Sequence, residues 1–506
     1  MAFKCFWVPI WLLIISHHSR ADNLSLLASA DLTKCTYGER GSLTATCYNA
    51  TPSYFKTTLY KFDHLDETLK CVNCVLTIID SNTFDLSGNQ INYLDLKGSQ
   101  IEILRPKAFM GLIFLTELNL SGNKIKAVYP GTFIGTKKIR TIDLSYNEIT
   151  TLVGSEFKEL ESLSELSLNR NQIKVIDEQA FSGLQNLNYM DLSYNLIEFV
   201  NISLYNLTNL NILSLKHNKI QKVTGFEFHN VSKLEQLDLS ENLLDDNFSI
   251  HLNPENVLRQ LDLSYNQIRT LWFSHGYLNR LELLDLSHNN ISQIRKSSLE
   301  GLHSLRFLHL QNNKLKILTT GQLSGFSQLQ FLNCSYNLIE QVAITGVFSV
   351  QNLNTLDLSH NFLSNLDYTA LTARLPSLSY LKLEDNVLPC SLEEEMNRDF
   401  AEDNFKYVLV DNVVGSFKCV NISVAKSHHR FLTDSYIQDD SLTASDIVMF
   451  VIMSLVLAAI GVLFYVQFLF YKGMQISFPA RVESTMNLIE ADNEQRDDGF
   501  ERIIEP

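Results

Sequence analysis

The chain has 506 residues, of which 45% are hydrophobic and 19% are charged, and its formal net charge is −15 at pH 7. Such a composition can form a large folded core, and it includes two apolar runs that are candidates for targeting or membrane segments. The acidic charge excludes nucleic acid as a partner that would be held through its phosphates.

Residues 1–21 have the layout of a secretory signal peptide. Lys4 precedes an apolar run over residues 5–15, and Ser19-Arg20-Ala21 supplies small residues around a cleavage expected after Ala21. A first membrane helix is the alternative, which is disfavoured because the run is too short to cross a bilayer. We therefore expect the mature chain to fold in an oxidising compartment.

Residues 22–90 are interpreted as an N-terminal cysteine cap that covers the exposed end of a repeat array. They contain Cys35, Cys47, Cys71 and Cys74, which indicate two disulfides with three pairings open. Cys71-Val-Asn-Cys74 could also be half of a metal site or a redox pair. A metal site needs a second pair at matching spacing, and Cys35 and Cys47 are twelve residues apart, so we favour disulfides.

One phrase recurs through residues 91–388, and Leu261-Asp-Leu-Ser-Tyr-Asn266 is its clearest copy. Its units follow L-x-x-L-x-L-x-x-N-x-[IL] thirteen times at a spacing of 23 to 25 residues, which indicates a solenoid. The two leucines of L-x-L point inward and the residue between them points outward. Each unit should therefore add one short strand to a parallel sheet.

An asparagine ends twelve of the thirteen phrases, and Ser99 takes its place in the first. Its amide has two donors and an acceptor, so it can satisfy backbone groups where the chain leaves the strand. The predicted asparagine ladder comprises Asn123, Asn147, Asn171, Asn195, Asn218, Asn242, Asn266, Asn289, Asn313, Asn337, Asn361 and Asn386. Large apolar residues further along the units should fill the outer side of the coils: Phe109, Phe133, Phe157, Phe181, Phe228 and Leu299.

These phrases resemble the leucine-rich repeat family in its 24-residue extracellular form, over roughly residues 70 to 424. The resemblance implies an α/β solenoid, a curved horseshoe of about 13 coils with a parallel concave sheet and disulfide caps at both ends. The layout is similar to the ectodomains of Toll-like receptors and to insect leucine-rich repeat adhesion proteins. The C-terminal cap departs from the family, since it has two cysteines where many members have four and its entry reads Asn386-Val-Leu-Pro-Cys390.

Residues 389–424 are the expected C-terminal cysteine cap, with Cys390 and Cys419 as its disulfide, and residues 425–446 are a polar stalk. Residues 447–471 carry no charge over 25 positions, enough to cross a hydrocarbon core of about 30 Å as a transmembrane helix. A buried core helix is the disfavoured alternative. Lys472 and Arg481 follow this run, so the short tail 472–506 is expected to be cytoplasmic. We thus expect a single-pass type I protein of the plasma membrane with an extracellular N-terminus.

Two positions of each strand are expected to face outward. One carries Asp in seven of thirteen units, which suits either a cation-seeking face or an ordinary solvated surface. At the other position, Leu283, Phe307 and Phe331 fall in consecutive units and form an apolar strip, beside which His309 interrupts the aspartates. Exposed apolar patches mark contact sites, so these four residues are the candidate partner-binding site. The alternative is that they stack on one another and fill the concave curvature.

The sequence also contains ten candidate sites for N-glycosylation. They are Asn23, Asn49, Asn119, Asn201, Asn206, Asn230, Asn247, Asn290, Asn333 and Asn421. Asn119 and Asn333 fall within predicted strands, and a glycan at Asn333 would cover part of the apolar strip.

We find no His-Glu-x-x-His, Gly-x-Ser-x-Gly or phosphate-binding glycine loop, and expect no enzyme activity, cofactor or metal. The concave face is expected to bind an extracellular or cell-surface protein, as in an adhesion molecule or co-receptor. The alternative is an innate-immune or developmental signalling receptor that acts through a partner or short tail motifs, because a 35-residue tail cannot hold a Toll-type signalling domain. Homo- or heterodimerisation is left open.

Overall fold

The computed structural model describes most of residues 34–408, within the first of the two units into which the chain divides, residues 1–425. The stretches inside this range that are not described are 38–41, 59–64, 82, 85–87, 201–203, 205–206, 224–227, 229–230, 247–251, 271–277, 295–298, 300, 320–322, 324, 344–349 and 401–405. In the described part, no helix combines the length and apolar character needed to cross a membrane.

Several predicted segments lie outside the described residues. These are the signal peptide 1–21, the stalk 425–446, the apolar run 447–471 and the tail 472–506. Cys419 lies outside as well, together with the sequons at Asn23, Asn201, Asn206, Asn230, Asn247 and Asn421.

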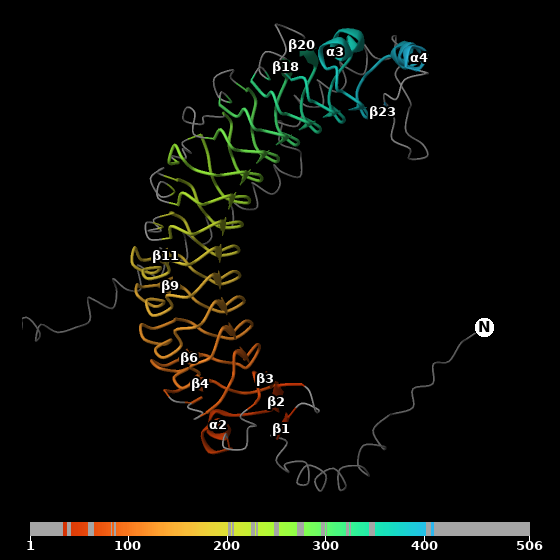
Figure 1. Cartoon of the computed structure of the whole chain (residues 1–506). Helices are drawn as coiled ribbons and strands as arrows, with labels where there is room; N and C mark the ends of the chain where they lie inside the picture. Colours follow the sequence, from red (N-terminus) through yellow and green to blue (C-terminus); the bar gives the residue numbers. More distant parts are fainter. Residues whose placement is uncertain are drawn as a thin grey trace, which may run out of the picture. The chain divides into compact units, whose positions relative to one another are not determined.

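Thirteen three-residue strands lie at the thirteen predicted phrases, each formed by the first two residues of the central L-x-L and the residue before them. They are β5(Tyr93–Asp95), β7(Glu117–Asn119), β8(Thr141–Asp143), β10(Glu165–Ser167), β12(Tyr189–Asp191), β13(Ile212–Ser214), β14(Gln236–Asp238), β15(Gln260–Asp262), β16(Leu283–Asp285), β17(Phe307–His309), β19(Phe331–Asn333), β21(Thr355–Asp357) and β22(Tyr380–Lys382). Neighbouring strands pair in parallel and in register, as where Asp238 lies opposite Asp262. The coils follow a bend, with this sheet on its inner side (Figure 1).

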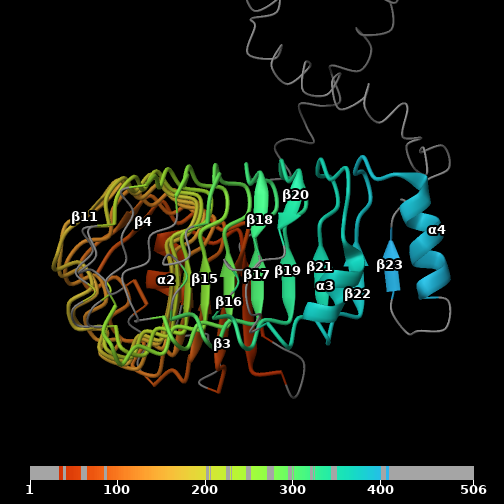
Figure 2. The ribbon, with the colours of Figure 1, turned by 90° about the horizontal axis from the view of Figure 1, so that it is seen from above.

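The sheet continues beyond these strands at both ends and has seventeen strands in all. At the N-terminal end β1(Lys34–Tyr37) runs antiparallel to β2(Thr44–Tyr48), and β3(Thr68–Val72) pairs in parallel with β2 and β5. At the other end β23(Lys406–Val408) pairs with β22, so a single row of strands extends along the described part (Figure 2). The parallel sheet therefore starts inside the segment that sequence alone suggests is a cap.

Disulfides close the N-terminal end, as predicted, and the structure selects one of the three open pairings. Cys35 bonds to Cys47 across the β1–β2 pair, and Cys71 bonds to Cys74 where β3 ends. The Cys71-Val-Asn-Cys74 motif is thus a local disulfide and not half of a metal site. At the other end, Cys390 takes part in a disulfide.

The outer side of the coils consists mainly of turns. Three small parallel sheets run along it: β4(Ile78–Ile79) with β6(Ile103–Leu104), β9(Thr151–Leu152) with β11(Val175–Ile176), and β18(Ile317–Thr319) with β20(Gln341–Ala343). The named helices are α2(Pro52–Thr58), α3(Tyr368–Arg374) and α4(Cys390–Asp399). The expected α/β class is therefore corrected to a β-solenoid. A coil of about 24 residues leaves room outside the phrase for turns but not for a regular helix in every coil.

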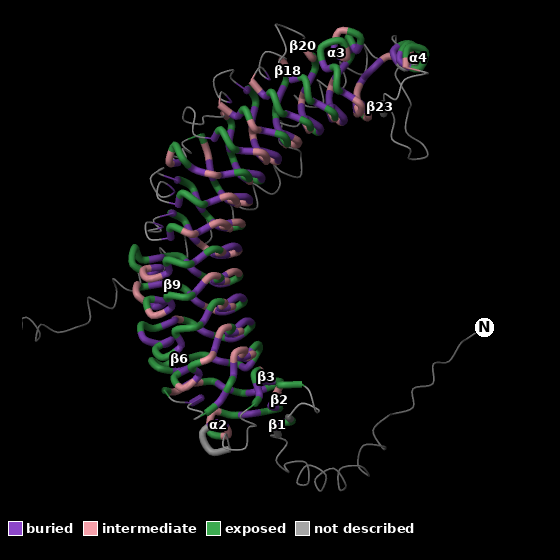
Figure 3. Tube along the Cα trace, viewed as in Figure 1, coloured by how far each residue is buried: buried purple, intermediate pink, exposed green. Residues whose placement is uncertain are grey.

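Buried side chains form a continuous core between the two sides of the solenoid (Figure 3). Every L-x-L leucine, or its isoleucine, methionine or cysteine substitute, is buried, including Cys334 as predicted. Under the outer turns, six phenylalanine rings follow one another at centroid distances of 5.3 to 6.4 Å: Phe55, Phe84, Phe109, Phe133, Phe157 and Phe181. Phe228 and Leu299 are buried as well, so all six predicted outer anchors are confirmed.

The asparagine ladder connects each coil to the one before it. Asn242 donates from Nδ2 to the carbonyl of Leu239 in its own coil at 3.1 Å and to Leu215 in the previous coil at 3.0 Å. Its Oδ1 accepts from the backbone N–H of Ile220 at 3.0 Å. The same pattern recurs from Asn123 to Asn386. The predicted role of these residues is therefore confirmed.

We predict that Asn242→Ala destabilises the solenoid by roughly 3 kcal/mol, because it leaves one N–H and two carbonyls without their partner. Denaturant unfolding measures this change, and hydrogen exchange at the Ile220 amide locates it. Lys219→Ala, at an exposed position next to Ile220 in the preceding coil, is the matched control. Equal stability of the two variants would show that water can replace the asparagine amide.

Candidate functional site

The predicted apolar strip is present on the concave sheet. Leu283, Phe307 and Phe331 lie opposite one another in adjacent strands β16, β17 and β19. The two phenylalanine rings are 6.4 Å apart between centroids, and the His309 ring lies 5.2 Å from that of Phe331. Phe307 is 39% exposed, whereas Leu283 and Phe331 are half-buried. The strip thus combines tilted ring contacts with an exposed central ring.

Arg306 adds a cation to one side of this strip. It directly precedes Phe307 and is exposed. Within the described residues no ion pair of Arg306 is found, whereas Arg259, two coils earlier, pairs with Glu235 and Glu282. The sheet therefore presents two aromatic rings and an imidazole here, and an exposed arginine directly precedes the strand of Phe307.

The aspartates of the concave face have a structural role that the sequence left undecided. Each of the seven accepts a hydrogen bond through Oδ1 from the backbone N–H two residues later, at 2.8 to 3.2 Å. Such a bond stabilises the turn that ends the strand. Two members, Asp191 and Asp357, are buried, and Asp357 also pairs with Lys382 at 3.0 Å. The described residues contain no cluster of three or more His, Cys, Asp or Glu side chains that could hold a metal ion.

The same turn explains two of the sequons. Asn119 and Asn333 replace the aspartate, and their Oδ1 atoms accept from the N–H of Ser121 and Ser335 at 3.0 Å each. Since the phrase places a serine two residues later, this substitution creates N-x-S without any further change. Both amides therefore have a role in the turn that is independent of glycosylation.

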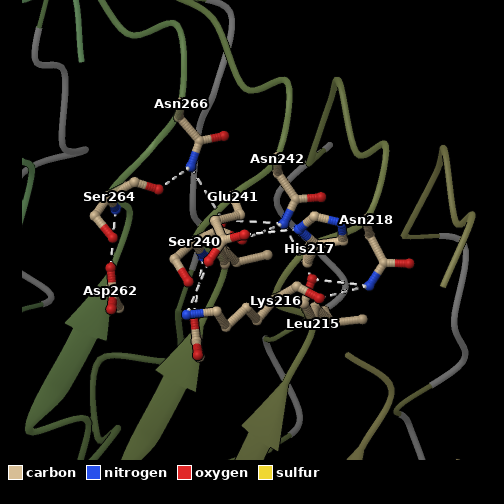
Figure 4. A network of polar contacts seen from close by, with 12 residues as sticks. Leu215, Lys216, His217, Asn218, Ser240, Glu241, Asn242, Asp262, Ser264 and Asn266 are labelled. Atoms are coloured by element: carbon tan, nitrogen blue, oxygen red, sulfur yellow. Dashed lines mark hydrogen bonds and ion pairs between the residues drawn. The ribbon is translucent and has the colours of Figure 1, made fainter. Parts of the chain in front are cut away.

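A second ordered row of side chains runs along the edge of the sheet, at the residue immediately before each ladder asparagine from Asn147 to Asn386. We call it the edge ridge, and it consists of Tyr146, Arg170, Tyr194, His217, Glu241, Tyr265, His288, Asn312, Tyr336, His360 and Asp385. All eleven have φ between 52° and 56°, a left-handed conformation that non-glycine residues seldom adopt. The chain reverses here, so that the next side chain turns inward to the ladder. In Figure 4, His217 and Glu241 lie beyond the strand ends, beside Asn218 and Asn242.

The edge ridge repeats every three coils. A trio of tyrosine, histidine and a polar residue begins at Tyr194, at Tyr265 and at Tyr336, each 71 residues after the last. In every trio the tyrosine and histidine rings are stacked, with centroids 4.5, 3.9 and 3.9 Å apart.

The polar residue of each trio contacts its histidine. His217 Nδ1 is 2.6 Å from Glu241 Oε2, and His360 Nδ1 is 3.0 Å from Asp385 Oδ2. In the central trio, the amide nitrogen of Asn312 lies 3.2 Å from His288 Nε2. Burial lowers the pKa of His288, which favours the neutral ring that can accept from this amide. Hydrogen bonds from His217 and Lys216 lower the pKa of Glu241 and keep its carboxylate charged.

The ridge begins with a cation held between two rings. The Arg170 guanidinium lies 5.2 Å from the Tyr146 ring centroid and 4.1 Å from that of Tyr194. Such stacking fixes the orientation of a side chain that is otherwise long and mobile. Arg170 is exposed and forms no ion pair with the residues that the structure describes.

Sequence reasoning missed the edge ridge, although a signal for it is present. The residues before the ladder asparagines read Tyr, His and polar in the same order three times. Leucine spacing does not reveal this order, because the ridge residues neither enter the core nor alternate with it. Comparing units three apart, instead of neighbours, would have found it.

We predict that Asp262→Asn stabilises the protein at pH 7. Burial, together with the charges of Asp285 and Asp238, raises the pKa of Asp262 above its ordinary 3.8. The charged carboxylate therefore lowers the free energy of unfolding. This loss is absent below pH 3.8 and is complete once the pH has risen through the folded-state pKa. Asparagine keeps the acceptor for Ser264 and removes the charge. Unfolding free energies at pH 7 and pH 3 measure the effect, in a host without N-glycosylation because Asn-Leu-Ser264 would be a sequon. A gain of the same size at both pH values would contradict the charge explanation.

Comparison with known proteins places the fold. A family model described as leucine rich repeat matches residues 114–173, 161–220, 208–268 and 279–339. No curated protein sequence matches the chain. The structure resembles a leucine-rich repeat protein of Leptospira interrogans, with 23% identity over 72% of this chain and 88% of that one, at a TM-score of 0.57.

Two further solved structures are of complexes. The LRIM1/APL1C complex has 17% identity over 92% of this chain and 87% of that one, at a TM-score of 0.54. The structure of the Toll–Spätzle complex from Drosophila has 17% identity over 68% of this chain and 57% of that one, at a TM-score of 0.51. At such identities the likeness shows the fold alone. The repeat matches, the parallel sheet and the asparagine ladder agree, and the chain belongs to the leucine-rich repeat family.

Proposed function

We propose that this is a cell-surface leucine-rich repeat protein that binds another protein through its concave face, as an adhesion molecule or co-receptor. The observation that carries the proposal is the strip formed by Leu283, Phe307 and Phe331, with Arg306 and His309 beside it. A leucine-rich repeat solenoid is typically a scaffold for protein interaction, with the concave surface as its contact face. The Toll–Spätzle and LRIM1/APL1C structures are examples of protein complexes with this fold.

The chemistry of the strip suits a protein partner. Aromatic and arginine side chains supply most of the energy at protein interfaces, and they cluster where water is excluded. The half-buried Phe331 ring contacts that of Phe307, which restricts the Phe307 side chain before a partner covers it. Most other concave positions are polar and therefore suit the rim of an interface. The expected partner is thus a protein with an apolar anchor that fits over Phe307.

We predict that Phe307→Ser combined with Phe331→Ser abolishes partner binding without unfolding the chain. Each truncated anchor should weaken binding roughly tenfold to a hundredfold, as at other interface hot spots. The test displays the full chain on cells and screens it against a library of extracellular proteins. Phe199→Ser, which truncates an exposed phenylalanine outside the concave sheet, is the matched control. A ligand that binds the double variant as well as the wild type would rule out the strip as the site.

The cell-surface location rests on the signal-peptide layout of residues 1–21 and on the uncharged run 447–471. We predict that an epitope tag after residue 21 is accessible on intact cells. A tag after residue 506 should become accessible only after permeabilisation. Antibody staining with and without detergent measures both. Detection of the full chain in the culture medium, or of the C-terminal tag on intact cells, would contradict a type I membrane protein.

A further inference from the structure

The edge ridge has a symmetry that the concave strip lacks. The ridge repeats the order tyrosine, histidine and polar residue. When a second ridge runs in the opposite direction about a point between Tyr265 and His288, the two rows pair in a regular way. Within the stretch from Arg170 to Asp385, each tyrosine then faces a histidine, and each polar residue faces another polar residue. Any row with this three-step order has such a point, but only suitable polar residues make the opposed pairs attractive.

The opposed polar residues are complementary. Reversal about this point places Arg170 opposite Asp385 and Glu241 opposite Asn312. The two members of each pair lie the same number of coils before and after the centre. The first is a cation with an anion, and the second is a carboxylate with an amide that can donate to it. We propose that the edge ridge binds the ridge of a second copy of this chain, antiparallel, about a two-fold axis between Tyr265 and His288. This is an isologous contact, in which one surface serves both partners.

The two ends of the ridge carry exposed side chains of opposite charge. Arg170 is exposed, is held between two rings and forms no ion pair among the described residues. The Asp385 side chain is 51% exposed, and only its Oδ2 is recorded in contact with His360. Placed opposite each other, the guanidinium and the carboxylate can form an ion pair between the two chains.

The middle of the ridge offers surface to cover. Tyr265 and Tyr336 are 53% and 52% exposed, which is high for two large side chains in one row. A tyrosine hydroxyl can donate to or accept from the imidazole that faces it across the axis. Stacking already fixes these rings within each chain, so association restricts them little.

The geometry of the edge favours a second copy over other partners. With strands about 4.8 Å apart, the ten coils from Arg170 to Asp385 give a line of contact roughly 40 Å long. An evenly bent edge superposes on itself when turned about the radius through its midpoint, so the two ridges can meet along their length (Figure 1). A partner that contacts the whole ridge must have side chains at the same spacing as the coils. A second copy has this spacing because its ridge is identical.

Disulfide cross-linking in the full chain tests this register. Two differently tagged copies are co-expressed, one with Glu241→Cys and the other with Asn312→Cys, positions that face each other across the axis. We expect a mixed-tag disulfide dimer and no dimer of either variant with itself. Cys334 does not interfere, because it is buried and burial raises the pKa of its thiol. Lys233→Cys with Ser304→Cys, which lie before the strands of the same two coils at the opposite edge, is the matched control. Absence of the mixed dimer, or equal cross-linking of the control pair, overturns the proposal.

Charge reversal provides an independent test in the full chain in detergent. Arg170→Asp and Asp385→Arg should each raise the dissociation constant of the dimer about tenfold, because each sets like charges opposite one another. The double variant should restore the wild-type value, since Asp at 170 then faces Arg at 385. Both substitutions suit the left-handed backbone, where arginine and aspartate already occur. Sedimentation measures the dimer, and a double variant no tighter than the single ones overturns the pairing.

This inference does not rest on the proposed function. The ridge lies along the edge of the sheet, whereas the strip lies on its concave face. Phe307→Ser with Phe331→Ser should therefore lose the protein ligand and keep the cross-link, so failure of one idea leaves the other intact.

Discussion

The fold depends on one hydrogen-bonding unit, the inward-turned asparagine amide at the end of each strand. This amide binds carbonyls of two coils and accepts from an N–H of the coil before it, so it satisfies backbone groups that a solenoid would otherwise bury unpaired. It can do so only because the residue before it adopts the left-handed conformation, as His217 and Glu241 do. The core, the register of the sheet and both candidate surfaces follow from this turn.

Because the ladder holds the coils in register, residues about 24 positions apart in the sequence become neighbours in space. Functional surfaces therefore consist of rows of residues from successive coils and not of continuous segments of the chain. The row that contains Asp262 stabilises turns through its carboxylates. The side chains in the row that contains Phe307 do not stabilise a turn, so they can vary to suit a partner. The row that contains His288 combines both, since its backbone makes the turn while its side chains make the edge ridge.

Periodicity predicts the features that every coil needs. It identified the thirteen strands, the ladder, the outer phenylalanines and the inward position of Cys334, because each is determined by whether a side chain must be buried. It failed where local geometry decides. The outer segments form turns rather than helices, and strands β2 and β3 join the sheet although their segment lacks the full phrase. The edge ridge was missed because contacts between left-handed residues in successive coils leave no mark on hydrophobic spacing.

Two steps of the ladder, from Asn195 to Asn218 and from Asn266 to Asn289, are one residue shorter than the usual 24. Their hydrogen bonds nevertheless remain at 2.9 to 3.1 Å, so the shorter spacing leaves the ladder unchanged. The ladder on the inner face thus keeps the same geometry in coils that differ in length. Insertions and deletions can remodel the back of such a protein while its recognition surfaces change only by substitution.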